Sequence, residues 1–196
     1  MTTPEMIENR TFDEIAVGDR ASISRTLTPR DIELFAAVSG DVNPAHLDPE
    51  YAAGDMFRRV IAHGMWGGGL ISAVLGTELP GPGTIYLAQD LHFRRPVGLG
   101  DTITATVTAT EKRPERHIIR FDCRCTNQKG EDVITGAAEV IAPSEKVRRP
   151  RVPVPEVRVY DHDGYRRLIA ATQGGEPLVT AVAHPCSAAA IRSAAE

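Results

Sequence analysis

The stretch at residues 65–79 constrains the fold more than any other part of the chain. It is an apolar run that contains three consecutive glycines, Gly67 to Gly69, and it ends before the turn sequence Pro-Gly-Pro-Gly at residues 80–83. Each glycine inside a helix costs about 1 kcal/mol relative to alanine. A helix with this sequence therefore needs other elements wrapped tightly around it, and we predict that residues 65–79 form a long central helix.

Four runs with β character follow that helix and supply the wrapping. They cover residues 84–93, 101–110, 117–126 and 132–141, and the short segments between them suit hairpin connections. Four consecutive strands after a long apolar helix predict an α+β fold in which an antiparallel sheet wraps around the helix. Such a sheet has a free edge that often pairs with a second copy. We therefore expect a homodimer or a higher homo-oligomer.

The segment before the central helix predicts a strand, a helix and a stiff loop. Residues 20–27 alternate apolar and polar side chains, which is typical of a half-buried strand. The next helix is expected to begin after Thr28, which can cap it, and to end at Gly40. Residues 41–49 contain two prolines and two aspartates, which indicates an ordered loop or a string of turns. A short helix is expected to restart at residues 49–53.

Composition and charge narrow the class of protein. With 42% hydrophobic and 24% charged residues, the chain has the composition of a soluble globular protein. Its formal net charge of -4 argues against a nucleic-acid or anionic-membrane partner. The three cysteines fit neither a disulfide framework nor a zinc site with paired ligands. We interpret them as small core fillers, and since the N-terminus has no apolar signal segment, we predict a cytoplasmic location.

The C-terminal part of the chain predicts a second domain. Residues 143–159 are rich in proline, arginine and valine with little periodicity, which favours a linker that includes the proline-broken basic run at 146–151. Residues 160–196 read as a helix, a lone apolar strand and another helix. A lone apolar strand cannot be buried by two helices, so we expect this segment to be the truncated start of an α/β domain.

The loop at residues 39–46 carries the candidate chemistry. Asp41 and His46 are two titratable groups five residues apart, Pro44 stiffens the loop between them, and Asn43 can orient either one. Adding water across a double bond conjugated to a thioester needs a base, an acid and donors for the enolate oxygen. Local chemistry alone also fits a simple turn, with Asp41 in an Asx-turn and His46 as an incidental histidine.

A family resemblance decides between these interpretations. The sequence Ser39-Gly-Asp-Val-Asn-Pro-Ala-His46, with Ala52 six residues later, resembles the hydratase 2 motif of the MaoC-like (R)-specific enoyl-CoA hydratases. The likeness continues through the His-Gly-Met sequence at 63–65 and residues 91–101, and it covers residues 11–142. It implies the hot-dog fold, in which a sheet wraps around a long central helix. Ala45 departs from the pattern, because an aliphatic residue is usual there.

The resemblance also implies roles for single residues. Asp41 and His46 would activate water and return a proton to the substrate, and the backbone N–H of Gly64 would donate to the thioester oxygen. Ser72 would support the aspartate, and Asn43 would order the loop. A tightly packed glycine and a serine bonded to its own helix are the structural alternatives for Gly64 and Ser72. His63 matches a family position too, but a helix-capping or core histidine explains it equally well.

The implied reaction is the reversible hydration of a trans-2-enoyl-CoA to the (R)-3-hydroxyacyl-CoA, without a metal or a redox cofactor, since coenzyme A is part of the substrate. Two alternatives stay open. One is a hot-dog acyl-CoA thioesterase, although Glu78 is the only carboxylate that residues 64–79 offer. The other is a non-catalytic acyl-CoA-binding or assembly module. Residues 161–196 resemble the start of a phosphate acetyl/butyryltransferase domain found fused behind MaoC-like domains, which implies a bifunctional parent protein.

Overall fold

The computed structural model describes residues 4–154 of the chain. The chain divides into two compact units, residues 1–153 and 154–196, and the description here concerns the first. The predicted transferase-like segment at 160–196 lies outside the described residues. The helices and strands of the first unit are β1 (Met6–Glu8), η1 (Phe12–Glu14), β2 (Arg20–Thr26), α1 (Pro29–Ser39), α2 (Pro44–Leu47), α3 (Pro49–Gly54), α4 (Gly64–Thr77), β3 (Ile85–Phe93), β4 (Thr102–Arg113), η2 (Pro114–Arg116), β5 (Ile118–Thr126), β6 (Asp132–Ile141) and β7 (Arg148–Pro150).

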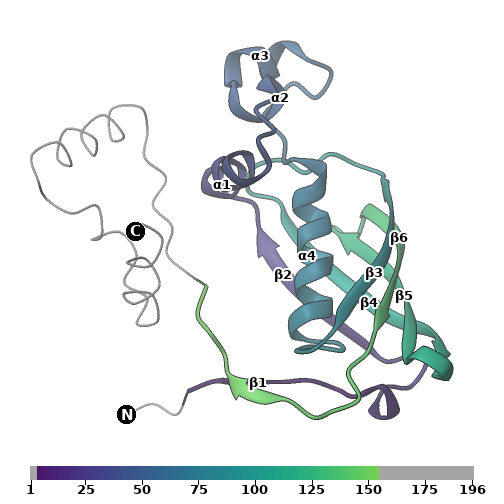
Figure 1. Ribbon diagram of the computed structural model, residues 1–196. Coiled ribbons are helices and arrows are strands. Elements are labelled where there is room, and N and C mark those ends of the chain that lie inside the picture. The colour runs from purple at the N-terminus through teal and green to yellow at the C-terminus, as the bar shows by residue number, and fades with distance from the viewer. Residues whose placement is uncertain (1–3, 155–196) are drawn as a thin grey trace, which may run out of the picture. The chain divides into compact units, whose positions relative to one another are not determined.

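The central feature of the fold is a five-stranded antiparallel sheet that curves around α4 (Figure 1). The strand order is β2-β4-β5-β6-β3, so β2 and β3 are the two edges. The core lies between the sheet and α4, and Ile71 and Val74 of α4 belong to the same fully buried cluster as Phe121 and Val107 of the sheet. This is the predicted α+β hot-dog arrangement, with the four strands after the helix placed as the sequence indicated.

The glycines of α4 allow the sheet to approach the helix closely. A Cβ atom added at Gly67 would come 2.4 Å from Cδ1 of Ile134 on β6, and one at Gly68 would come 3.2 Å from Cδ1 of Leu91 on β3. Real Cβ atoms do not tolerate the first distance, so a larger residue at Gly67 would push the helix and β6 apart. The predicted need for tight wrapping is therefore met at Gly67 and Gly68. Gly69 faces open space.

Strands β4 and β5 alternate buried and accessible residues in register, which explains the Cys-x-Cys spacing. Cys123 and Cys125 are fully buried on the face of β5 that packs toward α4. Burial raises the pKa of both thiols to about 12, so both stay protonated near neutral pH. They are core fillers, as predicted, and not nucleophiles.

Gly136 on β6 is required by the close approach of strand β3. A Cβ atom there would lie 2.0 Å from the backbone oxygen of Asp90, which cannot move without disturbing the β3–β6 pairing. We expect Gly136→Ala to lower the free energy of unfolding by about 1–3 kcal/mol or more. Gly76→Ala is the matched control, because its Cβ meets nothing within 4 Å and alanine is the better helix former. Urea unfolding of both variants measures the difference, and equal stability would contradict the expectation.

Helix α1 begins and ends where the sequence predicts. Thr28 and Asp31 form a reciprocal capping box, and Arg25 on β2 bonds the buried carboxylate of Asp31. Gly40 ends the helix in the left-handed region, with φ of 75°. The end of α1 thus fixes the point from which the Asp41 loop departs.

The linker predicted at residues 143–159 is partly a strand. Its residues 148–150 form β7, which pairs antiparallel with β1 at the other end of the chain. The buried side chain of Asn9 holds the two segments together, because it donates to the backbone oxygen of Glu145 and accepts from the N–H of Val147. The first unit consequently continues past residue 142, up to Pro153. Among residues 4–154, no helix is long and apolar enough to cross a bilayer.

Candidate active site

The loop that carries Asp41 is built from side-chain to backbone hydrogen bonds at every second residue. Ser39 Oγ accepts from the N–H of Asp41 at 3.2 Å, and Asp41 Oδ1 accepts from the N–H of Asn43 at 3.2 Å. Asn43 Oδ1 accepts in turn from the N–H of Ala45 at 3.1 Å and caps α2. Residues with short polar side chains favour such turns. Asn43 therefore takes part in two of these turns and caps α2, while its role in the reaction stays a prediction.

His46 projects from α2 and is fixed by one ring nitrogen. Its Nδ1 lies 2.9 Å from the backbone oxygen of Ile61. A carbonyl oxygen can only accept, so Nδ1 must carry the hydrogen, and the neutral ring then holds its lone pair on Nε2. The half-buried His46 ring is thus held in the tautomer that a general base needs, with Nε2 as the basic atom.

His63 and Gly64 stand at the N-terminus of α4, opposite the loop. His63 is 2% exposed, and its Nε2 lies 2.9 Å from the backbone oxygen of Asp41. Gly64 is the first residue of α4, where an N–H has no acceptor within the helix and the helix dipole is positive. A Cβ at Gly64 would come 3.0 Å from the Phe93 ring, so tight packing also favours glycine here. The donor role and the packing role are compatible.

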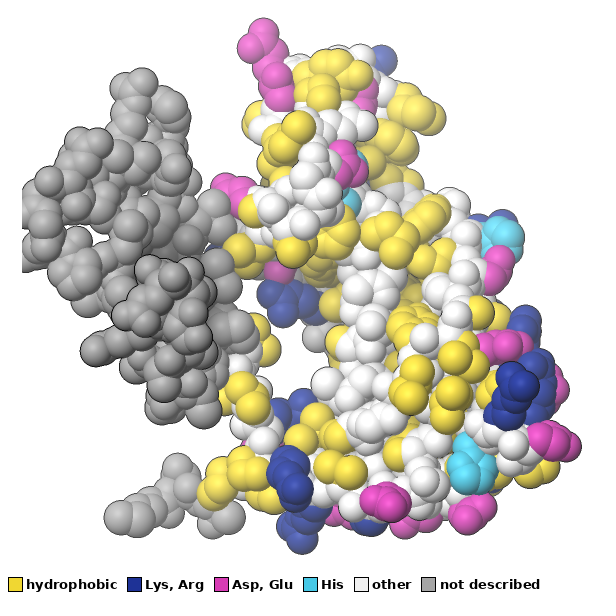
Figure 2. Space-filling model, in the orientation of Figure 1, with side chains coloured by type: hydrophobic (Ala, Val, Ile, Leu, Met, Phe, Trp, Pro, Cys, Tyr) yellow, Lys and Arg dark blue, Asp and Glu magenta, His cyan; other side chains and the backbone are white. Residues whose placement is uncertain are grey.

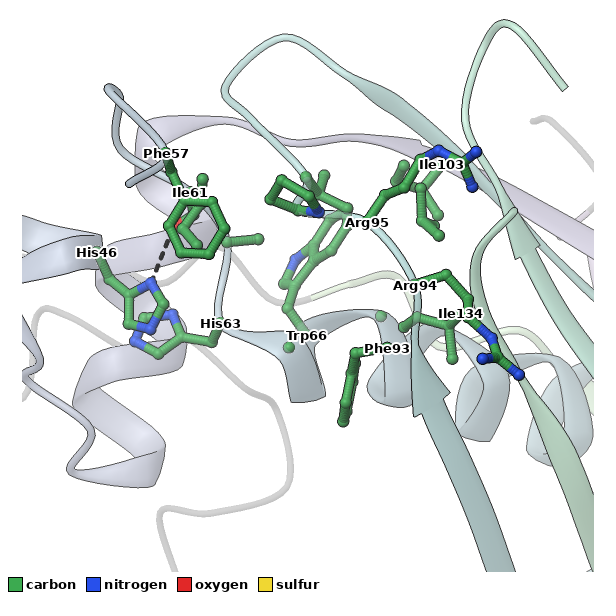
Figure 3. A pocket seen from close by; sticks show the side chains of 16 residues that line it. His46, Phe57, Ile61, His63, Trp66, Phe93, Arg94, Arg95, Ile103 and Ile134 are labelled. Atoms are coloured by element: carbon green, nitrogen blue, oxygen red, sulfur yellow. Dashed lines mark hydrogen bonds between the residues drawn. The ribbon is translucent and has the colours of Figure 1, made fainter. Parts of the chain in front are cut away.

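A cavity of about 290 Å³ opens beside these groups. Figure 3 shows the rings of His46 and His63 side by side at one end of it, and Ile103 and Ile134 toward the other. Most of its lining is apolar, whereas Arg94 and Arg95 bring the positive charges. The lining residues are His46, Phe57, Ile61, Ala62, His63, Gly64, Trp66, Gly67, Phe93, Arg94, Arg95, Pro96, Val97, Ile103, Val133 and Ile134. An apolar cavity with a few convergent polar groups is the usual form of a small-molecule site.

Asp41, His46 and His63 also form the donor set of a possible metal site, since their ligand-type atoms lie within 4.8 Å of one another. Two imidazoles and a carboxylate can hold Zn²⁺. The Nε2 of His63 donates to the Asp41 backbone oxygen, so the lone pair of that ring is on Nδ1, and the lone pair of the His46 ring is on Nε2. Each of these lone pairs can accept a proton as well as a metal ion, and proton acceptance is what an acid–base site requires.

Two residues considered from sequence lie away from this cluster. Ser72 is exposed on α4, eight residues and about 12 Å along the helix from Gly64. Within residues 4–154 no hydrogen bond joins Ser72 to Asp41, and its supporting role stays a prediction. Glu78 follows the opposite end of α4 and bonds Arg151. His63 is the N-cap residue of α4, but its side chain makes no capping bond, and its burial agrees with the core-histidine alternative.

Sequence reasoning missed the backbone acceptors of the two histidines. His46 bonds residue 61 and His63 bonds residue 41, so each imidazole reaches the main chain of the other segment. The residue types do not predict such contacts, because the contacts depend on how the segment between α3 and α4 packs against the loop. The only sequence signal was the position of His63 immediately before Gly64.

The comparisons with known proteins concern the family and the fold. A family model described as "MaoC like domain" matches residues 14–129. The chain is 50% identical over 133 residues to an (R)-specific enoyl-CoA hydratase of Rhodospirillum rubrum, covering 68% of this chain and 92% of that protein. A 3-hydroxybutyryl-CoA dehydratase of Methylorubrum extorquens is 41% identical, with 71% and 88% covered. The structure of R-hydratase PhaJ1 from Pseudomonas aeruginosa superposes with a TM-score of 0.76 at 45% identity, covering 80% of this chain and 100% of that one. By its motif, its fold and these matches, the chain belongs to the family of MaoC-like domains.

Proposed function

We propose that the protein catalyses the reversible hydration of a trans-2-enoyl-CoA to the (R)-3-hydroxyacyl-CoA. The observation that carries the proposal is the fixed ring of His46. Its Nδ1 is bound to the Ile61 carbonyl, which leaves Nε2 as the basic atom beside the carboxylate of Asp41. The names of the two curated relatives, a hydratase and the corresponding dehydratase, support the same reaction in its two directions.

The proposed reaction uses Asp41 and His46 together. They hold a water molecule, and Nε2 of His46 takes one of its protons as the oxygen attacks C3 of the enoyl group. The electron pair of the double bond moves toward the thioester oxygen, where the N–H of Gly64 and the positive end of α4 stabilise the enolate. Asp41 and His46 then return a proton to C2 of the substrate. One C–O bond and one C–H bond form on the same face, and no electrons are gained or lost.

This cycle needs neither a redox cofactor nor a metal, and it leaves the His46 ring in place. Nε2 gains and loses the proton, while Nδ1 keeps its hydrogen on the Ile61 oxygen throughout. We therefore propose that water and the acyl-CoA thioester are the only reactants. The apolar walls of the cavity suit the acyl chain, and Arg94 and Arg95 supply positive charge for the anionic carrier.

The experiment that tests this function mixes the purified protein with crotonyl-CoA. We expect the absorbance of the conjugated thioester to fall without release of a free thiol, and the product to be the (R) isomer on chiral analysis. Release of free coenzyme A would instead support the thioesterase alternative, which the bond of Glu78 to Arg151 at the far end of α4 disfavours. Binding of crotonyl-CoA without any turnover would support the non-catalytic module.

We also propose that the protein acts as a homodimer joined along strand β3. This edge strand exposes Ile85, Leu87 and Phe93 by 56%, 48% and 54%, and Figure 2 shows hydrophobic side chains gathered on the face that carries α4 and β3. A sheet edge with an exposed apolar surface is suited to pairing.

The substitution Leu87→Lys tests the dimer. A charge on this edge should oppose pairing, so we expect the mass measured by light scattering to fall by half relative to wild type. Val17→Lys is the control, because Val17 is 60% exposed but lies outside β3. A wild-type protein that is already monomeric would contradict the proposal.

A further inference from the structure

His63 occupies an unusual position for a buried histidine. It precedes α4 as the N-cap residue, yet its side chain makes no bond to its own helix. Only 2% of it is exposed, and within residues 4–154 its Nδ1 is buried without a hydrogen-bond partner. A buried nitrogen without a partner costs about 1–3 kcal/mol. A phenylalanine would fill the same space without that cost, so packing alone does not account for a histidine here.

The contacts of His63 involve both members of the proposed acid–base pair. Its Nε2–H donates to the backbone oxygen of Asp41 over 2.9 Å. Its ring lies against the ring of His46, with centroids 4.0 Å apart and an interplanar angle of 34° (Figure 3). The ring of Phe35 on α1 lies 4.9 Å away and completes the packing.

The loop needs such a contact because its own bonds are local. The turns at Ser39, Asp41 and Asn43 fix the shape of the loop but not its position relative to α4. At the His46 end, the loop is bound to Ile61 by the imidazole and by a backbone bond from the Ile61 N–H to Ala45. At the Asp41 end, among the described residues, the bond from His63 is the one that joins the loop to the residues before α4.

We propose that His63 is a positioning residue for the hydration reaction. Its Nε2–H holds the main chain of Asp41, and its ring supports the ring of His46. The distances between the Asp41 carboxylate, Nε2 of His46 and the N–H of Gly64 are thereby fixed. This inference rests on the proposed function only for its effect on turnover. The docking of the loop that it describes is a property of the fold and can be measured separately.

Two substitutions separate the hydrogen bond from the ring. His63→Phe keeps a buried ring beside His46 and removes the donor. His63→Gln places an amide N–H near the position of Nε2 and removes the ring. Because a misplacement of about 1 Å can cost about 100-fold in rate, we expect His63→Phe to lower kcat for crotonyl-CoA about 100-fold with KM within about twofold of wild type. We expect His63→Gln to recover at least about tenfold of that loss.

A matched control and a second readout keep the result specific. His117→Asn removes another histidine ring that stacks on an aromatic, Phe12, and we expect it to leave kcat unchanged. Hydrogen exchange measured by mass spectrometry should rise at residues 39–47 in His63→Phe but not in His63→Gln, while the rest of the domain exchanges as in wild type.

Each outcome has a clear meaning. Wild-type kcat in His63→Phe, or an equal loss in both variants, would overturn the inference. If the wild-type protein does not hydrate crotonyl-CoA, the proposed function fails, but the exchange experiment still decides whether His63 docks the loop. Unchanged exchange in His63→Phe would then refute the positioning role, and increased exchange confined to residues 39–47 would support it.

Discussion

Removing the basic nitrogen of His46 is expected to lower kcat for crotonyl-CoA by about 10²- to 10⁴-fold, the usual contribution of a general base. His46→Asn is the sharpest variant, because an asparagine amide can take the place of Nδ1–H and keep the bond to the Ile61 oxygen. Only Nε2 is then lost. Loss of enoyl absorbance under saturating substrate measures the effect.

Asp41→Asn should produce a similar loss. The amide oxygen can still accept from the N–H of Asn43, so the turn is kept while the charge is removed. Asp48→Asn is the matched control in the same loop, because Asp48 caps α3 through Oδ1 and asparagine caps equally well. If Asp41 and His46 act on one water molecule, the double variant should be little worse than either single variant. Near-wild-type activity in His46→Asn would contradict the assigned base.

The second large effect concerns the donor at the start of α4. Gly64→Pro removes the backbone N–H proposed to bind the enolate oxygen, and we expect kcat to fall by about 10²- to 10³-fold. The substitution is compatible with the fold, since proline is favoured at the first position of a helix. The preceding residue, His63, already has φ of -56° and ψ of 134°, in the extended region that a following proline requires.

Gly64→Ala is the control for this variant. Both substitutions add a Cβ that would come 3.0 Å from the Phe93 ring, but alanine keeps the N–H. The ratio of the two kcat values therefore measures the contribution of the backbone N–H. The loss of kcat that both variants share measures the effect of the added Cβ on the packing against Phe93. Equal activities in the proline and alanine variants would remove Gly64 from the mechanism and leave only its packing role.

Sequence predicted the elements whose cause is local or periodic. The caps of α1 at Thr28 and Gly40, and the four strands after α4, were placed to within a few residues. The pairing of β1 with β7 was missed, because it joins three-residue segments about 140 residues apart and leaves no periodic pattern. The same division applies to the site. The turns of Asp41 and Asn43 depend on neighbouring residues and could be predicted. The contacts of His46 and His63 depend on how the segment between α3 and α4 packs against the loop, which no local pattern determines.

The bonds between the loop and residues 61–63 also bear on how a substrate enters. Helices α2 and α3 project beyond the end of the sheet, on a segment that leaves the left-handed Gly40 and ends near Gly54 (Figure 1). This lobe is bonded to the segment before α4, because Ala45 and His46 bond Ile61 and Asp41 bonds His63. Swinging the lobe open would break the bonds that hold Asp41 and His46, so a thioester is expected to enter and leave the cavity while the lobe stays in place.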